Sequence, residues 1–191
     1  RGGPSHQARL PARSDECSPR TRVIEWLAGG GGTYGRWTAL LIGGLTLLRL
    51  VGLAVNRTDL FFDEAQYWAW SRDLGFGYLS KPPLIAWLIR LTTSLCGDGE
   101  ACARVSSPLL HAATAGLLYV IGRRLFDQRA GFWSALVYLT LPGISVSSNL
   151  VSTDPAMLLC WAAALYALIR LLEGGGLPFA LGLGLALGAG L

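Results

Sequence analysis

The sequence has little charge and lacks the common motifs for binding metals or nucleotides. Only 15% of its 191 residues are charged, whereas 52% are hydrophobic, and the mean hydropathy is +0.43. No Cys-x-x-Cys pair occurs among the four cysteines, and the glycines at 29–32 lack the lysine and the helix context of a phosphate-binding loop. The composition therefore predicts an all-α, polytopic membrane protein and excludes an ordinary soluble domain.

Most of the net positive charge lies near the N-terminus. Residues 1–36 hold six arginines and three acidic residues, so they supply +3 of the formal net charge of +4. A basic segment before the first apolar stretch follows the positive-inside rule for a cytoplasmic N-terminus and argues against nucleic acid as a partner. We expect residues 1–36 to be a disordered cytoplasmic tail. Residues 37–191, which stop within an apolar run, are expected to be the N-terminal part of a longer transmembrane domain.

Five apolar segments predict membrane spans. They cover residues 37–55, 106–122, 130–146, 156–172 and 179–191, the last of them truncated. Arg49 lies near one end of its span, where it is expected to snorkel outward, and His111 is expected to bond to a neighbouring helix. Cys96 and Cys102 lie between the first two spans, and they could form a disulfide in an oxidising compartment.

The length of the apolar stretch Leu84–Cys96 decides the predicted topology. This stretch is too short to span comfortably, and its leucines at 84, 88, 91 and 95 share one helical face, so we expect an amphipathic helix in the membrane interface. The span 106–122 then runs inward and delivers the arginines that follow it to the cytoplasmic side. The loop 56–105 and Asp154 therefore share the non-cytoplasmic face.

Two adjacent carboxylates, Asp63 and Glu64, stand among aromatic residues in this outer loop. Charges at a membrane boundary are costly, so the pair is a candidate site. A competing interpretation treats Asp63 as the N-cap of a short helix, in a capping box with Gln66. The same interpretation makes Asp154, which precedes Pro155, the N-cap of a later helix.

An outer site that contains Asp63, Glu64, Asp154 and Lys81 has a chemical logic. A carboxylate can take a proton from an acceptor hydroxyl as a general base, and a fixed cation can offset the charge that grows on a phosphate leaving group. Lys81 begins the amphipathic helix at headgroup depth, where a lipid-linked phosphate would lie, but an ordinary interfacial anchor explains it equally. Arg104, after that helix, has the same two interpretations, a phosphate ligand or a headgroup contact.

Four motifs, in order along the chain, resemble one known family. They are Asp63–Trp68 (DEAQYW), Gly77–Trp87 (GYLSKPPLIAW), Gly122–Phe126 (GRRLF) and Asp154-Pro155. From about Trp37 onward the chain resembles the N-terminal part of membrane glycosyltransferases of the protein O-mannosyltransferase and lipid A aminoarabinose transferase superfamily, with the fold called GT-C. The resemblance implies inverting transfer of a sugar from a polyprenyl-phosphate carrier to a lipid, glycan or protein acceptor on the non-cytoplasmic face.

The resemblance also implies roles for individual residues. Asp63 resembles the catalytic base, Glu64 its motif partner, and Asp154 a second acid that orients the acceptor or the base. The residues that resemble ligands of the donor phosphate are Lys81, Tyr67 and Tyr78. Because the carrier phosphate is a good leaving group, no separate general acid is required. The expected partners are the lipid-linked sugar, its acceptor and membrane lipids.

Two departures from the family pattern limit these expectations. Gln66 stands where relatives commonly carry Arg, and Ser80 stands where the aminoarabinose transferase has Glu, so neither a metal nor another cofactor is assigned. We expect a bacterial inner-membrane protein with its site facing the periplasm, and the sugar and acceptor stay open. Two other classes also stay open: a transporter or channel with an outward-facing acidic cation site, and a non-catalytic assembly protein in which Asp63 is only a helix cap.

Overall fold

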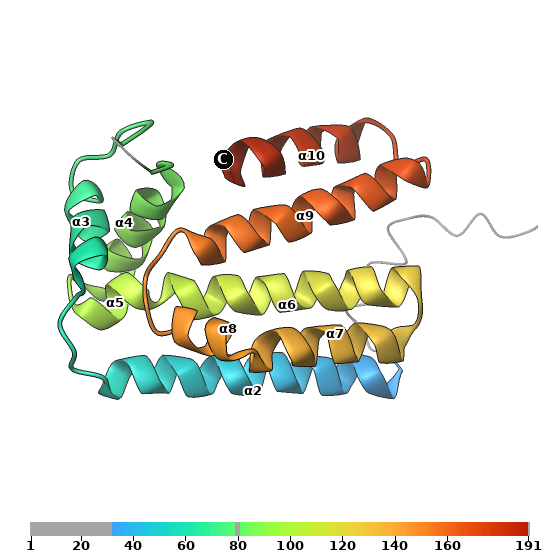
Figure 1. Ribbon diagram of the computed structural model, residues 1–191, viewed down its shortest axis with the longest axis horizontal. Helices are drawn as coiled ribbons and strands as arrows, with labels where there is room; N and C mark the ends of the chain where they lie inside the picture. The colour runs from blue at the N-terminus through green and yellow to red at the C-terminus, as the bar shows by residue number, and fades with distance from the viewer. Residues whose placement is uncertain (1–31, 79–80, 191) are drawn as a thin grey trace, which may run out of the picture. The chain divides into compact units, whose positions relative to one another are not determined.

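The structure, a computed structural model, describes residues 32–78 and 81–190. Within these ranges it consists of helices joined by turns and loops, without strands (Figure 1). The helices are α2 (Thr33–Val55), α3 (Phe62–Trp70), α4 (Leu84–Cys96), α5 (Glu100–Arg104), α6 (Ser106–Leu125), α7 (Gln128–Thr140), α8 (Pro142–Ser147), α9 (Asp154–Leu172) and α10 (Leu177–Gly190). Residues 1–31, which make up most of the predicted tail, lie outside the described residues.

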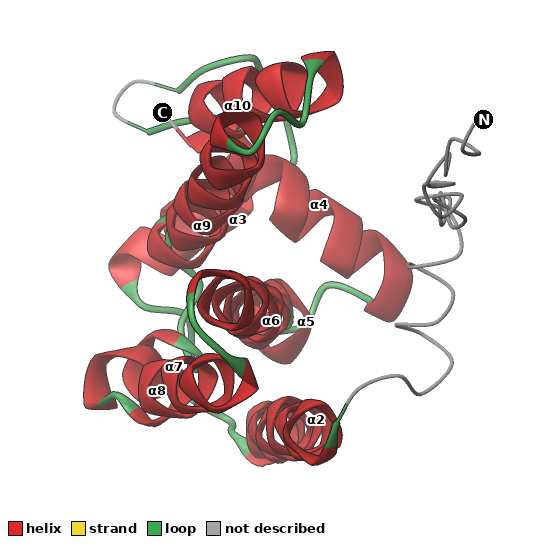
Figure 2. Ribbon diagram, turned by 90° about the vertical axis from the view of Figure 1, so that its right-hand side faces the viewer, coloured by secondary structure: helices red, strands yellow, loops and turns green. Residues whose placement is uncertain are grey.

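Helix α6 occupies the middle of the bundle. Seen nearly end-on, it lies among α2, α7 and α9 (Figure 2). Many of its buried residues are small or carry a hydroxyl, such as Ser107, Thr114 and Ala115, and such residues let neighbouring helices approach closely. Three helical segments are long and apolar enough to cross a membrane: α2, α9 and the run Glu100–Leu125, which contains α5 and α6. The predicted all-α fold with membrane-spanning helices is confirmed for the described part of the chain.

Helix α2 turns its large apolar side chains outward. Its buried residues are Thr38, Thr46 and Leu53, whereas Trp37 and Leu48 are 58% and 66% exposed. In water an apolar surface of this extent would promote association. A bilayer solvates it without cost, because hydrocarbon chains are as apolar as leucine. The outward pattern is therefore that of a helix in lipid.

A close crossing joins α6 and α7 at the end of the bundle away from α3 (Figure 1). Gly122 faces Gly131, and a β-carbon on Gly122 would lie 2.8 Å from the α-carbon of Gly131. Asp127, in the turn between the helices, caps α7 by accepting a backbone hydrogen bond. Arg124 donates to Glu173 at the end of α9 with a distance of 2.9 Å between Nε and Oε1. The basic turn therefore lies beside the C-terminal end of α9.

The predicted span 130–146 is divided between two helices. Helix α7 ends at Thr140 and α8 begins at Pro142. Proline has no N–H for the carbonyl four residues earlier, and it forces the preceding residue out of the helical region. Leu141 accordingly has a ψ of 131°. The two pieces contain 13 and 6 residues, so neither alone crosses a hydrocarbon core.

Two other predicted boundaries shift. Helix α2 begins at Thr33 and not at Trp37, so Thr33–Arg36 belong to the helix and not to the tail. Helix α10 begins at Leu177, before the predicted start at residue 179, because Pro178 is tolerated in a first helical turn. Hydropathy locates the apolar part of a helix, whereas the helix ends depend on weaker local signals.

Three short helices gather at one end of the bundle, where α2 ends and α6 and α9 begin (Figure 1). We call this region the loop end; it comprises the described residues of 56–105, the loop 148–153 and the first turns of α6 and α9. Helix α4 lies across the bundle and not along it (Figure 2). A small apolar core holds the region together, and its buried members are Tyr67, Ile85, Ile89, Ala103 and Val151.

Helix α4 turns the C-terminal half of its leucine face outward, whereas Leu84 and Leu88 are half-buried. Its buried residues are Ile85, Ala86, Ile89 and Thr93. Leu91 and Leu95 are 57% and 80% exposed. The hydroxyl of Thr93 can be buried because it donates to the Ile89 carbonyl at 2.8 Å. An outward leucine face suits contact with acyl chains, as the predicted interfacial helix requires.

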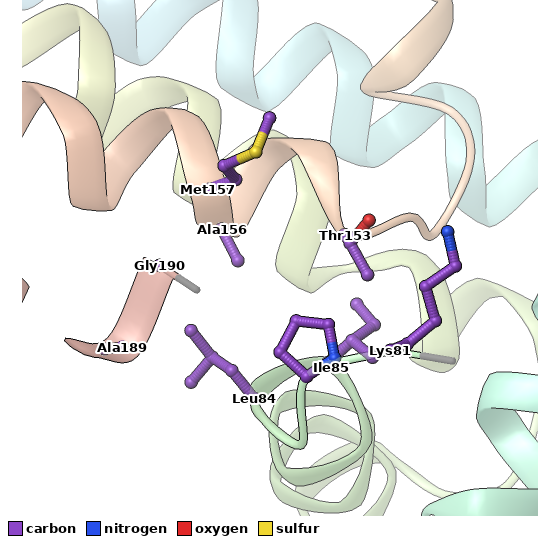
Figure 3. Close-up of a pocket in the computed structure, with 9 residues that line it drawn as sticks. Lys81, Leu84, Ile85, Thr153, Ala156, Met157, Ala189 and Gly190 are labelled. Atoms are coloured by element: carbon purple, nitrogen blue, oxygen red, sulfur yellow. The ribbon is translucent and has the colours of Figure 1, made fainter. Parts of the chain in front are cut away.

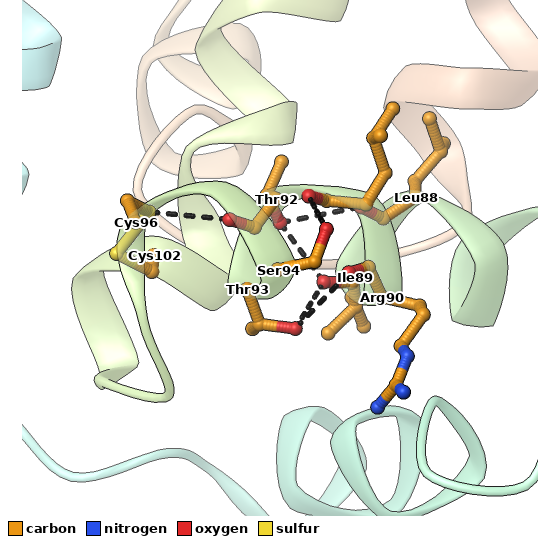
Figure 4. Close-up of a disulfide and its surroundings, with 9 residues drawn as sticks. Leu88, Ile89, Arg90, Thr92, Thr93, Ser94, Cys96 and Cys102 are labelled. Atoms are coloured by element: carbon orange, nitrogen blue, oxygen red, sulfur yellow. Dashed lines mark hydrogen bonds between the residues drawn. A yellow bond between two sulfur atoms is a disulfide. The ribbon is translucent and has the colours of Figure 1, made fainter.

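The disulfide that the sequence leaves open is present between Cys96 and Cys102 (Figure 4). It closes the turn between α4 and α5, where Gly97 ends α4 with a φ of 99°. Arg72, just after α3, forms an ion pair with Asp98 of the same turn at 2.7 Å. A covalent bond and an ion pair therefore both hold this turn.

Removal of this disulfide is expected to destabilise the loop end. Replacing Cys96 and Cys102 by serine releases a short loop, which in the chain-entropy account costs about 2 kcal/mol. Thermal unfolding in detergent, with and without a reductant, measures the effect. The reductant should lower the midpoint of the wild type and leave that of the double variant unchanged; equal shifts in both proteins would contradict the expectation.

Candidate active site

Glu64 and Arg104 form a buried ion pair inside the loop end. Only 3% of Glu64 and 1% of Arg104 are exposed. Oε2 of Glu64 lies 2.6 Å from Nη2 of Arg104, and Oε1 lies 2.9 Å from Nε, which is a two-pronged geometry. Two charges at this depth require such pairing, because removal of either partner leaves the other charge buried and uncompensated.

Two backbone N–H groups complete the surroundings of Glu64. Oε1 accepts from the N–H of Val151 at 2.7 Å, and Oε2 accepts from the N–H of Phe61 at 3.0 Å. Burial by itself raises the pKa of the Glu64 carboxyl, but the bonds from Arg104, Val151 and Phe61 outweigh burial and hold the pKa below its ordinary value. Glu64 is therefore ionised at neutral pH.

Arg104 directs its other donors to the backbone before α3. Nη1 donates to the carbonyl of Thr58 and Nη2 to that of Asp59, each at 3.0 Å. The ion pair thus joins four segments: the chain after α2, helix α3, helix α5 and the loop before α9. A guanidinium enclosed in this way favours a positioning role for Arg104 over the predicted contact with a phosphate.

Asp63 is not the N-cap of α3, so the capping interpretation of this residue is wrong. The helix begins at Phe62, its N-cap is Phe61, and Glu64 instead of Gln66 reaches back to the Phe61 N–H. Asp63 lies in the first turn of the helix and is exposed. Negative charge is favourable there because of the helix dipole. The carboxylate of Asp63 therefore lies at the surface of the loop end.

Asp154 is also not an N-cap. It is the first residue of α9, and the N-cap position belongs to Thr153. Pro155 follows in the first turn, where the missing N–H has no intrahelical partner to lose. The side chain of Asp154 is exposed, and that of Thr153 makes no capping hydrogen bond. The carboxylate of Asp154 thus lies at the loop end without serving as a cap.

The two tyrosines predicted to bind the donor phosphate both belong to the loop-end framework. Tyr67 is 4% exposed and packs in the small apolar core. Tyr78 stacks on Trp70 with ring centroids 4.7 Å apart. Its hydroxyl lies 3.0 Å from the carbonyl oxygens of Trp70 and Asp73 and accepts from the N–H of Gly75 at 3.1 Å. These contacts favour structural roles for both side chains.

Lys81 lines a cavity of about 210 Å³ between the start of α4, the first turns of α9 and the end of α10 (Figure 3). Most of its wall is apolar, from residues such as Leu84, Ile85, Ala156 and Met157. The side chains of Lys81 and Thr153 supply the polar groups (Figure 3). An apolar cavity with a cation at its edge suits an amphipathic ligand that has an anionic head.

The predicted site residues therefore fall into two groups. Those inside the loop end are Glu64, Arg104, Tyr67 and, half-buried, Tyr78. Those exposed at the same end are Asp63, Lys81 and Asp154. Within residues 32–78 and 81–190, no group of three or more His, Cys, Asp or Glu residues is arranged to hold a metal ion.

Sequence reasoning missed two contributors to this region, Val151 and Thr153. Thr153 directly precedes the Asp154-Pro155 motif, so its place in the sequence was a usable signal. Val151 contributes through its backbone N–H, which has no side-chain signature and is recognised only from the fold.

The family of the chain follows from its similarity to known proteins. Residues 80–191, more than half of the chain, match the family described as dolichyl-phosphate-mannose-protein mannosyltransferase. The chain belongs to this mannosyltransferase family. The match includes Lys81 and every other residue that lines the cavity, whereas Asp63 and Glu64 precede it.

Three similar proteins are named as transferases of sugars. A lipid A galacturonosyltransferase of Rhizobium johnstonii is 42% identical over 150 residues, which cover 78% of this chain and 32% of that protein. An undecaprenyl phosphate-alpha-4-amino-4-deoxy-L-arabinose arabinosyl transferase of Pseudomonas paraeruginosa is 31% identical over 152 residues, 73% of this chain and 27% of that protein. A protein of the same name from Pseudomonas fluorescens, numbered 1, is 32% identical over 89 residues, 46% of this chain and 16% of that protein.

The chain spans about a third or less of the length of these curated relatives. No solved structure matches it. Membership of the mannosyltransferase family agrees with the all-α fold and the membrane setting of this chain.

Proposed function

We propose that this chain belongs to an integral-membrane glycosyltransferase that moves a sugar from a polyprenyl-phosphate carrier to a lipid, glycan or protein acceptor. The observation that carries the proposal is the cavity beside Lys81, which combines an apolar wall with a cation. A polyprenyl phosphate has the matching chemistry, an apolar chain with an anionic head. The names of the relatives, which refer to undecaprenyl phosphate and to lipid A, support the same class of donor and acceptor.

In the proposed reaction the acceptor hydroxyl attacks the anomeric carbon of the sugar with inversion. Asp63 takes the proton of that hydroxyl as the new carbon–oxygen bond forms. The bond between the anomeric carbon and the carrier phosphate breaks, and its electron pair leaves with the phosphate. Lys81 offsets the charge that grows on this phosphate. Asp154, exposed at the same end of the bundle, orients the acceptor or Asp63.

Glu64 and Arg104 act in this proposal as positioning residues. Their ion pair fixes helix α3, which carries Asp63, against the loop that leads to Thr153 and Asp154. Productive reaction requires reacting atoms held within a fraction of an ångström, so a rigid support raises the rate without contact with the substrate. Tyr67 and Tyr78 belong to the same support.

Thr153 adds a second polar group to the proposed donor site. Thr153 lines the cavity together with Lys81 (Figure 3), and its side chain is not used for capping α9. A hydroxyl can donate to a phosphate oxygen beside an ammonium group, which adds geometric selectivity to the attraction between charges.

We place the loop end on the non-cytoplasmic side of the membrane. The Cys96–Cys102 disulfide belongs to an oxidising compartment. The basic turn with Arg123, Arg124 and Arg129 lies at the opposite end of the bundle, where the positive-inside rule puts the cytoplasm (Figure 1). For a bacterial protein we therefore propose that the site faces the periplasm.

Replacement of Lys81 by alanine tests the proposed donor site. We expect the KM for a labelled polyprenyl-phosphate sugar to rise about ten- to a hundredfold, which corresponds to the loss of one hydrogen bond to a charged group. Transfer of the label to a membrane lipid extract by the full-length protein in nanodiscs measures the effect. Because the cation acts on the donor, the KM for the acceptor should stay nearly constant.

Arg90→Ala is the matched control for this experiment. Arg90 is an exposed cation on α4 and does not line the cavity. The substitution Arg90→Ala should therefore leave the donor KM unchanged. Equal effects of Lys81→Ala and Arg90→Ala on the donor KM would mean that Lys81 only attracts anionic lipids in general and does not contact the donor phosphate specifically. Absence of both transfer and donor hydrolysis in the wild type would favour the transporter class, which expects cation binding to survive without Lys81.

A further inference from the structure

The break between α7 and α8 leaves backbone groups that need partners inside the bundle. The last four carbonyls of a helix have no intrahelical partner, and Pro142 supplies no N–H to replace one. In hydrocarbon such groups must be satisfied by the protein, because water is absent.

Arg49, on α2, reaches both sides of the break. Its Nη2 lies 2.7 Å from the carbonyl oxygen of Leu139 on α7 and 3.4 Å from the hydroxyl oxygen of Ser145 on α8. The expectation that Arg49 snorkels outward is therefore wrong. The carbonyl exposed by the break offers the guanidinium a closer partner than the membrane surface does.

His111, on α6, reaches both sides as well. Its Nδ1 lies 2.8 Å from the hydroxyl oxygen of Tyr138 on α7, and its Nε2 lies 3.1 Å from that of Ser147 on α8. The ring is fully buried. The predicted bond from His111 to a neighbouring helix is confirmed, and it joins two helices instead of one. Two side chains from two different helices thus each bridge the same break.

The loop after α8 connects this break to the candidate active site. Residues 148–153 link α8 to α9 and include Val151, which donates to Glu64, and Thr153, which lines the cavity. Ser107 on α6 donates to the Leu150 carbonyl at 2.6 Å and anchors the middle of the loop. The direction in which α8 leaves the break therefore decides where this loop begins.

We propose that Arg49 and His111 are positioning residues that lock the angle between α7 and α8 and so hold the loop 148–153 in place for sugar transfer. Neither residue lines the cavity. The link to turnover rests on the proposed function, whereas the lock itself does not. Even a half-buried arginine is costly within a membrane span, and a two-sided lock explains the presence of Arg49 here.

Spin labels on the two sides of the break test the lock directly. Cysteines introduced at the exposed positions Trp133 and Val146 would be about 20 Å apart along a continuous helix. Cys17 and Cys160 are replaced by alanine, and the full-length protein is measured in nanodiscs. We expect a narrow distance distribution in this background and a distribution at least about twice as wide in Arg49→Met and in His111→Leu.

Turnover of the same variants tests the positioning role. We expect kcat/KM to fall about tenfold or more in Arg49→Met at an unchanged yield of folded protein. Arg49→Lys should recover part of this loss and part of the distance width, because an ammonium group can bond the Leu139 carbonyl but cannot fork to both sides. Arg36→Met is the matched control, since Arg36 is exposed on the same helix and should change neither quantity.

The outcomes separate the lock from the proposed function. Wider distances with lower turnover support the proposal, and partial recovery in Arg49→Lys supports it further. Distances that stay narrow in both Arg49→Met and His111→Leu overturn the lock. Wider distances with full turnover overturn the positioning role. Wider distances in a protein whose wild type transfers no sugar keep the lock and reject the proposed function. Should His111→Leu fail to fold, Arg49→Lys and Arg49→Met still decide between these results.

Discussion

Replacing Glu64 by alanine is expected to reduce the free energy of unfolding by about 3–5 kcal/mol, the effect of leaving a buried charge without its partner. Arg104 would stay enclosed, 1% exposed, with no carboxylate opposite it. The N–H groups of Val151 and Phe61 would lose their acceptor at the same time. Unfolding in a graded denaturant, followed by the fluorescence of the loop-end tryptophans, measures the loss.

Two variants sharpen this experiment. Glu64→Gln keeps the size of the side chain and one acceptor oxygen, so it isolates the charge and should cost less than alanine. Asp98→Ala removes the exposed ion pair with Arg72 and should cost about 1 kcal/mol or less. Equal losses of unfolding free energy in Glu64→Ala and Asp98→Ala would show that the buried ion pair of Glu64 contributes no more stability than the exposed pair of Asp98.

The stability that Glu64 contributes should depend on pH in one direction. Its pKa is lower in the folded protein than in the unfolded chain, so the folded state binds fewer protons in the acidic range. The contribution is therefore complete above the unfolded pKa of about 4.3 and is lost as the pH falls through the lower, folded pKa. The midpoint difference between wild type and Glu64→Gln should shrink on acidification, and a difference that grows would contradict this assignment.

Asp63→Asn is expected to lower kcat by about 10²- to 10⁴-fold, the usual contribution of a positioned general base. The donor KM should change little, because the proposed contact with the carrier phosphate comes from Lys81. The side chain is exposed in the first turn of α3, so the variant should fold like the wild type. Single-turnover transfer with labelled donor in nanodiscs measures the chemical step separately from product release.

The control for Asp63→Asn is Asp73→Asn. Asp73 is also an exposed acid of the loop end, but it follows the C-terminal end of α3. Its replacement should leave kcat within about twofold of the wild type, as for a surface charge away from the site. Full turnover in Asp63→Asn would show that Asp63 is not the general base. Similar losses of kcat in both variants would point to a general effect of negative charge on acceptor binding.

Sequence reasoning recovered the helices whose apolar runs are long and failed where the chain is interrupted. The run from Trp37 to Val55 could be assigned from hydropathy alone, because it contains no proline and only one charged residue, Arg49. The run after Ala130 is equally apolar, and there the decisive residue is a single proline, Pro142. A hydropathy window averages over a single proline, although that proline ends one helix and begins another.

The candidate site divides along similar lines. Adjacent carboxylates and a lysine before two prolines are visible as local motifs. Asp63 lies in the first turn of α3, Lys81 just before α4 and Asp154 at the start of α9, and these helix ends gather at one end of the bundle (Figure 1). The partner of Glu64 could not be deduced locally, because Arg104 lies 40 positions further along the chain. Long-range pairing decides which acid of the motif turns inward, and only the fold supplies it.

Glu64 and Asp63 are neighbours on one helical turn, and this adjacency has a consequence for directed evolution of the protein. Successive side chains on a helix are rotated by about 100° from each other, so Asp63 cannot share the inward direction of Glu64, and its side chain is exposed. The buried side chains of Glu64 and Tyr67 set the register of α3, and this register leaves the preceding residue, Asp63, at the surface. Libraries that vary the two positions independently would mostly sample helices turned the wrong way, whereas libraries that keep Glu64 and Arg104 as a unit can explore the surface around Asp63.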